Sequence, residues 1–306
     1  MKTVVFAYHN MGLSGLEALC RHGYDIVAVF THEDDPREYC WFGSVKNWAG
    51  QRKIPVYTPE EIKSQQWIKK IAQFKPDIIF AFYYRKMICS EILSLPRLGA
   101  FNLHGSLLPL YRGRCPVNWV LIHGEKQTGV TLHCMTAKPD AGDIVGQKAI
   151  AIAFGDTAKT LYDKLCRTTD MLLDELLPLL KNGQFPRRKQ DLAAGSYFGG
   201  RKPADGRIDW TKPSTDIYNL IRAVTEPYPG AFGFLENDDK LIIWWAEPAE
   251  CKNNMLPGTV DTTEEEVLVQ TGKNAIKLKD IEVKGKRFTG KQISNYFKNG
   301  KVTKLK

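Results

Sequence analysis

The residues best suited to chemistry lie in one stretch, residues 101–119, which reads FNLHGSLLPLYRGRCPVNW. It holds a carboxamide at Asn102 and an imidazole at His104, and its glycines and prolines favour a shaped loop over a helix. If the stretch begins at the end of a strand, Asn102 and His104 leave on one face, because they are two residues apart. A donor amide beside a titratable ring suits acyl chemistry. The alternative is that Asn102 caps a turn and His104 is a hydrogen-bonded core histidine.

A third candidate, Asp140, lies further along in the segment TAKPDAGD, residues 136–143, after the alternating segment GVTLHCM, residues 129–135. Its position between a proline and Ala141-Gly142 suits an aspartate that points into a cleft. The alternative is an Asx-turn in which Asp140 supports only its own backbone.

The elements that must position these residues follow the order strand, helix, strand. Unbroken apolar runs are typical of strands covered on both faces, and polar or amphipathic stretches between them predict loops and helices. The expected strands are residues 3–7, 25–30, 55–57, 78–82, 100–103, 129–135 and 144–152, and the expected helices are residues 14–22, 45–52, 60–74, 117–123 and 157–180. This order predicts an α/β fold with a doubly wound, Rossmann-like parallel sheet.

In such a sheet, ligands bind outside the carboxyl ends of the strands. This rule selects the polar or aromatic loops at residues 8–12 and 83–88 and the loop that follows Leu103. None of them contains a G-x-G-x-x-G or Walker lysine motif. The motifs therefore give no support to a dinucleotide or ATP site.

The composition changes near Ser196, where the chain becomes rich in glycine and charge. Short strands with turns then follow at residues 232–236, 240–245, 258–261, 266–271 and 275–283, with helices at residues 214–225 and 291–297. This pattern predicts a small OB-like β-barrel. We therefore expect a catalytic domain at residues 1–200 and a C-terminal β-barrel-like domain at residues 201–306.

The bulk composition is that of a soluble protein, with 306 residues, 43% hydrophobic and 25% charged. Seven cysteines without a C-x-x-C pair indicate reduced thiols and a cytoplasmic location. We expect no secretory signal and no membrane insertion, since no apolar run approaches the roughly 20 residues of a span. The net charge of +9 is concentrated in residues 284–306, either as a solvated face or as a phosphate-binding surface.

The motifs together resemble the 10-formyltetrahydrofolate-dependent formyltransferases. The resemblance rests on Asn102-x-His104, the SLLPLYRGRCP loop, the GVTLHCM strand and Asp140 of KPDAGD, and it extends to about residue 245. It is closest to the formyltransferase domain of the bifunctional UDP-4-amino-4-deoxy-L-arabinose formyltransferase and UDP-glucuronic acid decarboxylase. Agreement at three separated positions, in order and spacing, favours the catalytic interpretation of Asn102, His104 and Asp140.

The resemblance implies formyl transfer from 10-formyltetrahydrofolate to the 4-amino group of a nucleotide-linked amino sugar. The acceptor is then UDP-4-amino-4-deoxy-L-arabinose or a dTDP-4-amino-4,6-dideoxyhexose, used for lipopolysaccharide lipid A or O-antigen. Asn102 and His104 donate hydrogen bonds to the oxygen that gains charge. Asp140 raises the affinity of His104 for a proton and takes up, directly or through water, the proton that the amine releases. The mechanism requires no metal.

The resemblance also implies the binding residues. The folate contacts are expected at Lys86, Met87 and Ile88, through backbone groups, and at Arg114, Thr136, Ala137, Lys138 and Pro139. The acceptor contacts are expected at Ser106, Tyr111, Arg112, Arg201, Lys202 and Tyr228. Arg201 and Lys202 suit a diphosphate, and Tyr228 the base or sugar. The alternatives are a solvated charge pair for the first two and an aromatic corner packed under the β-domain for Tyr228.

Other interpretations stay open. The chain is either a piece of a bifunctional protein or a stand-alone enzyme, and Leu110 stands where relatives often carry a polar residue. A methionyl-tRNA formyltransferase fits the basic tail, but the acidic stretch HEDDPREYCWFG, residues 32–43, opposes tRNA, so we expect no nucleic-acid partner. A non-catalytic folate-binding module and a formate-releasing hydrolase are further alternatives. A homodimer is left open, because the C-terminal domain can supply an interface or only cap a cleft.

Overall fold

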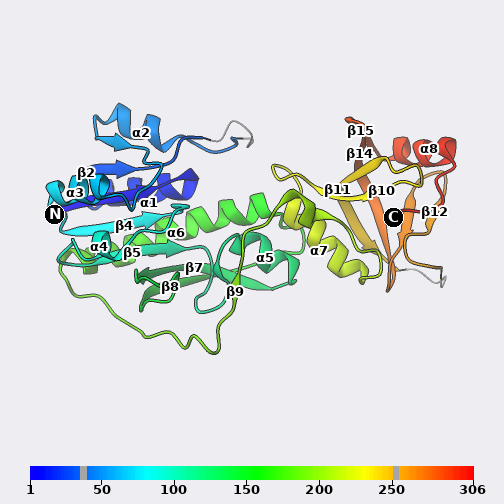
Figure 1. Ribbon diagram of the computed structural model, residues 1–306. Coiled ribbons are helices and arrows are strands. Elements are labelled where there is room, and N and C mark those ends of the chain that lie inside the picture. The colour runs from blue at the N-terminus through cyan, green and yellow to red at the C-terminus, as the bar shows by residue number, and fades with distance from the viewer. Residues whose placement is uncertain (35–39, 251–254) are drawn as a thin grey trace. The chain divides into compact units, whose positions relative to one another are not determined.

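The computed structural model describes residues 1–34, 40–250 and 255–306, and these form two compact units (Figure 1). The first unit contains Met1–Pro116, Gln127–Ala151 and Tyr162–Gly199, and the second contains Val117–Lys126, Ile152–Leu161 and Gly200–Lys306. The division of the chain at residues 200 and 201 stays a prediction, since the second unit also takes in two earlier segments. Cys251 and residues 35–39 of the acidic stretch lie outside the described residues.

The first unit is built on a sheet that has seven strands within the described residues, in the order β3-β2-β1-β4-β5-β7-β8. The strands from β3 to β5 in this order run parallel, whereas β7 is antiparallel to β5 and β8 to β7. The strands are β1 Lys2–Ala7, β2 Asp25–Phe30, β3 Val56–Tyr57, β4 Ile78–Phe82, β5 Ala100–His104, β7 Gln127–Cys134 and β8 Ile144–Ala151. The predicted α/β class is confirmed.

Helices cover both faces of the parallel part of this sheet, which explains the unbroken apolar runs of its strands. The helices are α1 His9–Arg21, α2 Val45–Gln51, α3 Gln65–Phe74, α4 Ser90–Leu93 and α6 Ala158–Lys181, whose first turn belongs to the second unit. On β4, Ile79 and Ala81 share a core with Ile71 of α3. On the opposite face, a Cβ added at Gly15 of α1 would overlap the Phe82 ring.

Helix α1 begins at His9, so the predicted loop at residues 8–12 and helix start at residue 14 are wrong. The Gly12 N–H donates to the Tyr8 carbonyl oxygen at 3.0 Å, and the helix therefore starts directly after β1. The absence of a side chain at Gly12 permits this, because an added Cβ would lie 3.2 Å from the backbone carbon of Ala7. Close packing of the helix onto the strand overrides the loop preference of the polar sequence.

The second unit is an antiparallel sheet, ordered β10-β11-β14-β13-β12 with β15 paired to β14. Hydrogen bonds join its two edges through the end of the chain, since Val260 N–H donates to Thr303 O at 2.8 Å and Phe234 N–H to Lys306 O at 3.0 Å. This closure is that of a small barrel. The elements are α5 Pro116–Ile122, η1 Pro203–Gly206, α7 Ser214–Val224, β10 Ala231–Phe234, β11 Lys240–Ala249, β12 Val260–Thr262, β13 Val267–Gln270, β14 Ala275–Val283, β15 Lys286–Thr289 and α8 Lys291–Gly300.

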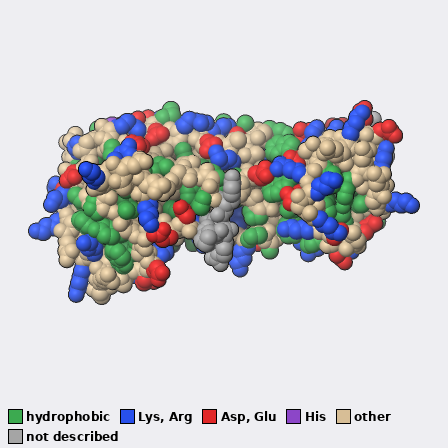
Figure 2. Space-filling view, turned by 90° about the horizontal axis from the view of Figure 1, so that it is seen from above, with side chains coloured by type: hydrophobic (Ala, Val, Ile, Leu, Met, Phe, Trp, Pro, Cys, Tyr) green, Lys and Arg blue, Asp and Glu red, His purple; other side chains and the backbone are tan. Residues whose placement is uncertain are grey.

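Charges of both signs are distributed over the face of the molecule that Figure 2 shows. Basic side chains near the end of the chain form ion pairs with acidic side chains of the second unit. The pairs are Lys284–Asp239, Arg287–Glu226, Arg287–Asp280, Lys298–Glu264 and Lys306–Asp238. These pairs offset part of the basic excess at residues 284–306. Among the helices that are described, none combines the length and the apolar character needed to cross a membrane.

Candidate active site

The polar residues of the site come from β5 and β7, where the sheet becomes antiparallel. This strand pair places Asn102 opposite His133 and His104 opposite Thr131. Alternate residues of a strand share a face, so all four side chains lie on one side of the sheet. The rings of His104 and His133 are 7% and 2% exposed, and such buried polar groups need hydrogen-bond partners.

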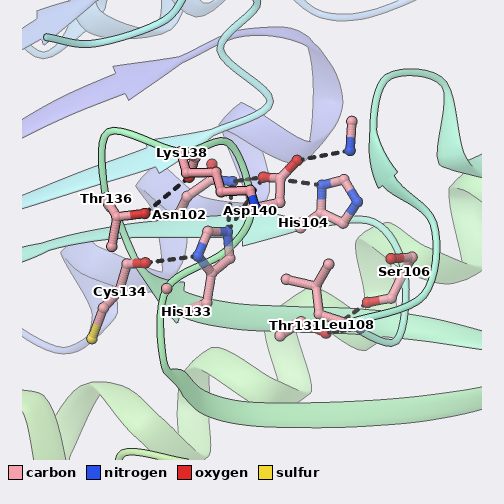
Figure 3. A network of polar contacts seen from close by, with 12 residues as sticks. Asn102, His104, Ser106, Leu108, Thr131, His133, Cys134, Thr136, Lys138 and Asp140 are labelled. Atoms are coloured by element: carbon pink, nitrogen blue, oxygen red, sulfur yellow. Dashed lines mark hydrogen bonds and ion pairs between the residues drawn. The ribbon is translucent and has the colours of Figure 1, made fainter. Parts of the chain in front are cut away.

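Asp140 reaches this face from the loop after β7, with its backbone in the left-handed region at φ 49°. Its Oδ1 lies 3.3 Å from Asn102 Nδ2, 3.6 Å from His104 Nδ1 and 3.5 Å from His133 Nε2 (Figure 3). Its Oδ2 accepts a hydrogen bond from the Gly113 N–H at 2.9 Å. One carboxylate thus gathers Asn102 and His104, the two other residues of the predicted catalytic set.

The charge state of Asp140 follows from its neighbours. Burial alone would raise the pKa of this carboxyl, but the positive charge of His104 and the hydrogen bond from the Gly113 N–H lower it. Together these lowering effects outweigh the effect of burial, so the pKa of Asp140 lies well below its ordinary value. Asp140 is therefore ionised at neutral pH and can stabilise a positive charge on His104.

The tautomer of His104 is set by the Tyr111 carbonyl oxygen, which lies 2.7 Å from Nε2. A carbonyl oxygen only accepts hydrogen bonds, so Nε2 carries a hydrogen in both charge states of the ring. Nδ1 is then the nitrogen that takes up or releases a proton, and it is the nitrogen that faces Asp140. This is the arrangement of a carboxylate-supported general acid or base.

The loop after β5 is fixed by a short parallel pairing, β6 Arg112–Gly113 with β9 Tyr197–Phe198. Gly113 has φ 97°, and a Cβ there would overlap the carbonyl oxygen of Phe198. Both observations require glycine at this position. The same backbone conformation directs the Gly113 N–H to Asp140.

The segment at residues 182–199, which carries β9, also holds the Asp140 loop. Gln190 Nε2 donates to the carbonyl oxygens of Asp140 at 3.0 Å and Gly142 at 2.6 Å. Ser196 Oγ accepts a hydrogen bond from the Tyr111 N–H at 2.8 Å. One returning segment therefore fixes both loops that contact the predicted catalytic set.

Two loops carry the residues assigned to the folate. After β4, Met87 is 43% exposed, whereas Ile88 is buried. Lys86 Nζ donates to the carbonyl oxygens of Pro59 and Glu60 at 2.9 and 2.6 Å. This loop borders a cavity of ≈320 Å³ that is lined by His32, Glu33, Thr58, Pro59, Glu60, Arg85 and Lys86.

The second folate loop lies between β7 and Asp140. Thr136, Ala137 and Lys138 are exposed, and Thr136 Oγ1 donates to the Lys138 carbonyl oxygen at 2.9 Å. Pro139 is half-buried, and Arg114 is an exposed cation whose N–H donates to the Phe198 carbonyl oxygen at 2.9 Å. The folate roles of these residues stay predictions.

The acceptor residues expected in the loop after β5 are mostly buried. Ser106 is 0% exposed and donates to the Leu110 carbonyl oxygen at 2.7 Å. The Tyr111 ring is buried and stacks on Phe198 with ring centroids 5.2 Å apart, and Arg112 is also buried. These side chains shape the loop, and their direct contact with an acceptor stays a prediction.

The remaining acceptor candidates belong to the second unit. The Arg201 guanidinium lies over the Trp119 ring, 4.8 Å from its centroid, and donates to the Asp205 carbonyl oxygen at 2.8 Å. The Lys202 N–H donates to the Asp205 side chain at 2.6 Å, and Tyr228 N–H donates to the Thr225 carbonyl oxygen at 3.1 Å. Their phosphate and sugar roles also stay predictions.

Sequence reasoning missed His133 and Gln190. The alternation of GVTLHCM places His133 on the same face as Thr131, which is a usable signal once the pairing with β5 is known. Gln190 has no local signal, because its partners lie about fifty residues earlier in the chain. In the described ranges, no group of three or more His, Cys, Asp or Glu is arranged to hold a metal ion.

The chain belongs to the formyl transferase family, because residues 1–176 match the formyl transferase domain and residues 201–298 match the formyl transferase C-terminal domain. It is a formyl-transferring enzyme.

Solved structures share the fold at low sequence identity. WlaRD, a sugar 3N-formyl transferase crystallised in the presence of dTDP and 5-N-formyl-THF, is 19% identical over 94% of this chain and 98% of its own, with a TM-score of 0.71. An N-formyltransferase from Helicobacter canadensis in complex with folinic acid and dTDP-3-aminofucose is 22% identical over 91% and 98%, with a TM-score of 0.67. HypX from Aquifex aeolicus in complex with tetrahydrofolic acid is 18% identical over 98% and 48%, with a TM-score of 0.61. These likenesses establish the fold.

Proposed function

We propose that the protein transfers a formyl group from 10-formyltetrahydrofolate to the 4-amino group of a nucleotide-linked amino sugar. The observation that carries this proposal is the convergence of Asn102 and His104 on Asp140, at 3.3 and 3.6 Å. An amide donor, a titratable ring and a carboxylate are the groups that acyl transfer to an amine needs. The folate and dTDP-sugar named for the structurally similar transferases point in the same direction.

The acceptor that we favour is UDP-4-amino-4-deoxy-L-arabinose, because the sequence motifs resemble the formyltransferase domain of the bifunctional enzyme that acts on it. A dTDP-4-amino-4,6-dideoxyhexose is the second candidate. Either product suits lipopolysaccharide synthesis, for lipid A or for O-antigen, in the cytoplasm. The two similar transferases are named for 3-amino sugars, so the position of the amino group must be tested directly.

The geometry of the site supports a role for each residue of the predicted catalytic set. The bound 10-formyltetrahydrofolate supplies the formyl carbon. Asn102 N–H and protonated His104 donate to the formyl oxygen as it gains negative charge. The ionised Asp140 raises the affinity of His104 for its proton and takes up, directly or through water, the proton that the attacking amine loses. That proton is then available to the folate nitrogen as the formyl group leaves. Positioning of two bound substrates lowers the barrier further.

The residues assigned to the folate fit a flat heteroaromatic ligand that carries carboxylates. Met87 offers an exposed apolar side chain, 43% accessible, next to backbone groups of its loop. Arg114 offers an exposed guanidinium, which pairs well with a carboxylate. Thr136, Ala137 and Lys138 present an exposed loop directly before Asp140.

Methionyl-tRNA is the alternative acceptor. It is disfavoured because cations of the basic tail, among them Lys284, Arg287 and Lys298, already pair with carboxylates of the second unit. Part of the acidic stretch supports the same conclusion, since Glu33 lies 2.9 Å from Lys46 and receives a hydrogen bond from Thr58. A phosphate backbone would have to displace these pairs.

The test is a formylation assay with 10-formyltetrahydrofolate and four acceptors: UDP-4-amino-4-deoxy-L-arabinose, a dTDP-4-amino-4,6-dideoxyhexose, a dTDP-3-amino sugar and methionyl-tRNA. We expect turnover with a 4-amino sugar nucleotide, lost in His104→Gln and retained in His22→Gln. His22 is a matched control because it also lies near an aspartate, with Nε2 2.8 Å from Asp174, but outside the site.

Each other outcome selects a different conclusion. Formylation of the tRNA alone would refute the sugar acceptor, and formylation of the 3-amino sugar alone would refute the 4-amino position. Formate release without any acceptor would favour the hydrolase. Folate binding without turnover would favour the non-catalytic module.

A further inference from the structure

His133 is a buried member of the site to which the proposed mechanism gives no task. Its ring is 2% exposed and lies on β7 opposite Asn102. Nδ1 lies 2.8 Å from the Cys134 carbonyl oxygen, and Nε2 lies 3.1 Å from Asn102 Nδ2 (Figure 3). The imidazole therefore connects a fixed backbone carbonyl to the carboxamide of the catalytic set.

The Cys134 carbonyl decides which nitrogen of His133 carries the hydrogen. A carbonyl oxygen only accepts, so Nδ1 is a donor. In the neutral ring, Nε2 then has a lone pair and accepts one amide hydrogen of Asn102. In the charged ring, Nε2 is also a donor and would face the amide hydrogens of Asn102. Only the neutral ring is compatible with an Asn102 amide that turns its NH₂ group to His133.

The second amide hydrogen of Asn102 is directed to Asp140 Oδ1 over 3.3 Å, which is long for a hydrogen bond. A long hydrogen bond is readily exchanged for a shorter one to an oxygen that gains negative charge. The opposite amide orientation would place Asn102 Oδ1 against the Asp140 carboxylate, which repels it. His133 and Asp140 thus select one orientation of the amide together.

We propose that His133 is a positioning residue for formyl transfer: in its neutral form it fixes the Asn102 carboxamide so that one N–H remains available to the formyl oxygen. The kinetic consequence rests on the proposed function. The hydrogen-bonding pattern itself can be measured without any substrate.

The charged groups around the ring make this arrangement dependent on pH. Asp140, from the loop after β7, lies 3.5 Å from Nε2, and His104, from β5, faces the same carboxylate oxygen. On β8 the residue paired with His133 is the uncharged Ile144. Protonation of His133 directs Nε2–H to Asp140 and turns the Asn102 amide away. The charged form of His133 should therefore support a lower kcat than the neutral form.

The kinetic test compares His133→Phe and His133→Gln with the wild type and with His22→Gln. Phenylalanine keeps the ring but cannot accept a hydrogen bond, whereas glutamine brings an amide oxygen to the place of Nε2. We expect His133→Phe to lower kcat about tenfold to a hundredfold, with KM for both substrates changed less than about twofold. His133→Gln should stay within about tenfold of the wild type, and His22→Gln should match it.

The pH profile separates positioning from packing. His133→Gln removes one ionisation, so the acid limb of log kcat should be less steep than in the wild type. A purely structural role would lower the melting temperature and leave the slope unchanged. A wild-type slope in His133→Gln overturns the proposal, and it does so even when His133→Phe fails to fold.

The substrate-free test is nitrogen-15 NMR of the histidine rings, with His133 assigned from the signal that is lost in His133→Gln. In the neutral ring we expect a protonated Nδ1 and an unprotonated Nε2. A hydrogen on Nε2 of the neutral ring overturns the proposal, as does wild-type kcat in His133→Phe. If the wild type formylates no acceptor, the proposed function fails, while this spectrum still decides how His133 holds Asn102.

Discussion

The two halves of the sheet in the first unit use their residues in opposite ways. In the parallel half, β4 consists of five buried apolar residues, IIFAF, and makes no contribution to the polar network. In the β5–β7 pair, one face carries Asn102, His104, Thr131 and His133, although these strands are about as deeply buried. Burial is therefore similar in the two halves, while the polar network is confined to one of them.

The difference has a physical cause. Helices cover both faces of the parallel half, and a helix side offers few free donors or acceptors to a buried polar group. The polar face of β5 and β7 is covered by loops, whose backbone groups are available: the Tyr111 carbonyl contacts His104, and the Gly113 N–H contacts Asp140. Stability and activity should therefore respond separately to changes in the two halves.

The largest expected effect is on catalysis. Asp140→Asn keeps the size of the side chain but removes the charge that supports His104, so we expect kcat to fall about a hundredfold to ten-thousandfold. The melting temperature should change little. The measurement is steady-state kinetics with the accepted sugar nucleotide, beside thermal unfolding.

Asp77→Asn is the control for this charge change. Asp77 precedes β4 and pairs with Arg97 at 2.8 Å on the surface, so its loss should leave kcat unchanged and cost less than about 1 kcal/mol. If Asp140→Asn were no slower than Asp77→Asn, the separation between the two halves of the sheet would be refuted.

A core deletion in the parallel half should have the reverse effect. Phe80 is 0% exposed and stacks on Phe82 with ring centroids 5.6 Å apart, so Phe80→Ala should destabilise the protein by about 3 to 5 kcal/mol. The kcat per folded molecule should be close to that of the wild type. Met171→Ala on α6, where the side chain is 54% exposed, should stay within about 0.5 kcal/mol in the same denaturant titration. A large kcat loss in Phe80→Ala, measured where the protein is folded, would contradict the comparison.

Gly113→Ala should moderately lower both the stability of the protein and its kcat. Its φ of 97° and the Phe198 carbonyl oxygen oppose a side chain, so we expect a cost of about 1 to 3 kcal/mol. Displacement of the Gly113 N–H from Asp140 should also lower kcat, by about tenfold. Gly50→Ala in α2 is the control: nothing lies within 4 Å of an added Cβ, and the change should stabilise the helix by about 0.5 to 1 kcal/mol. Equal effects at the two glycines would show that the loop is not held by Gly113.

The smallest expected effect concerns the stability of the parallel half towards acid. Burial, followed by the charges of Lys86 and Arg85, lowers the pKa of His32 to about 4 from its ordinary value of 6.5. His32 binds a proton more readily in the unfolded chain than in the folded protein. The contribution of neutral His32 to the free energy of unfolding is therefore complete above pH 6.5 and is lost as the pH falls towards 4.

We expect this loss to be about 1 to 2 kcal/mol, because solvent partly screens the ring. His32→Gln should flatten the decrease in unfolding free energy between pH 6.5 and 4, since glutamine can accept the 3.0 Å hydrogen bond from Arg85 N–H without a proton to bind. His22→Gln should leave the curve close to that of the wild type, and an unchanged slope in His32→Gln would show that acid acts elsewhere.

Local patterns in the sequence predicted much of this architecture. The apolar runs of β1, β2 and β4 were expected as strands, since only strands covered on both faces tolerate such continuous hydrophobicity. The shared direction of Asn102 and His104 followed from the period of a strand. The start of α1 was mispredicted, because the packing of Gly12 against Ala7 is not encoded in local propensity.

The sequence by itself determined the chemical groups, their order and the strand that carries Asn102 and His104, because these depend on neighbouring residues. Only the tertiary structure decided that Asp140 faces both of them, that His133 lies opposite Asn102, and that Gln190 and Gly113 hold the carboxylate in place. Such contacts join residues about 30 to 50 positions apart. Closing a loop of that length costs entropy, and the packing and hydrogen bonds that offset this cost are not recorded in any local sequence pattern.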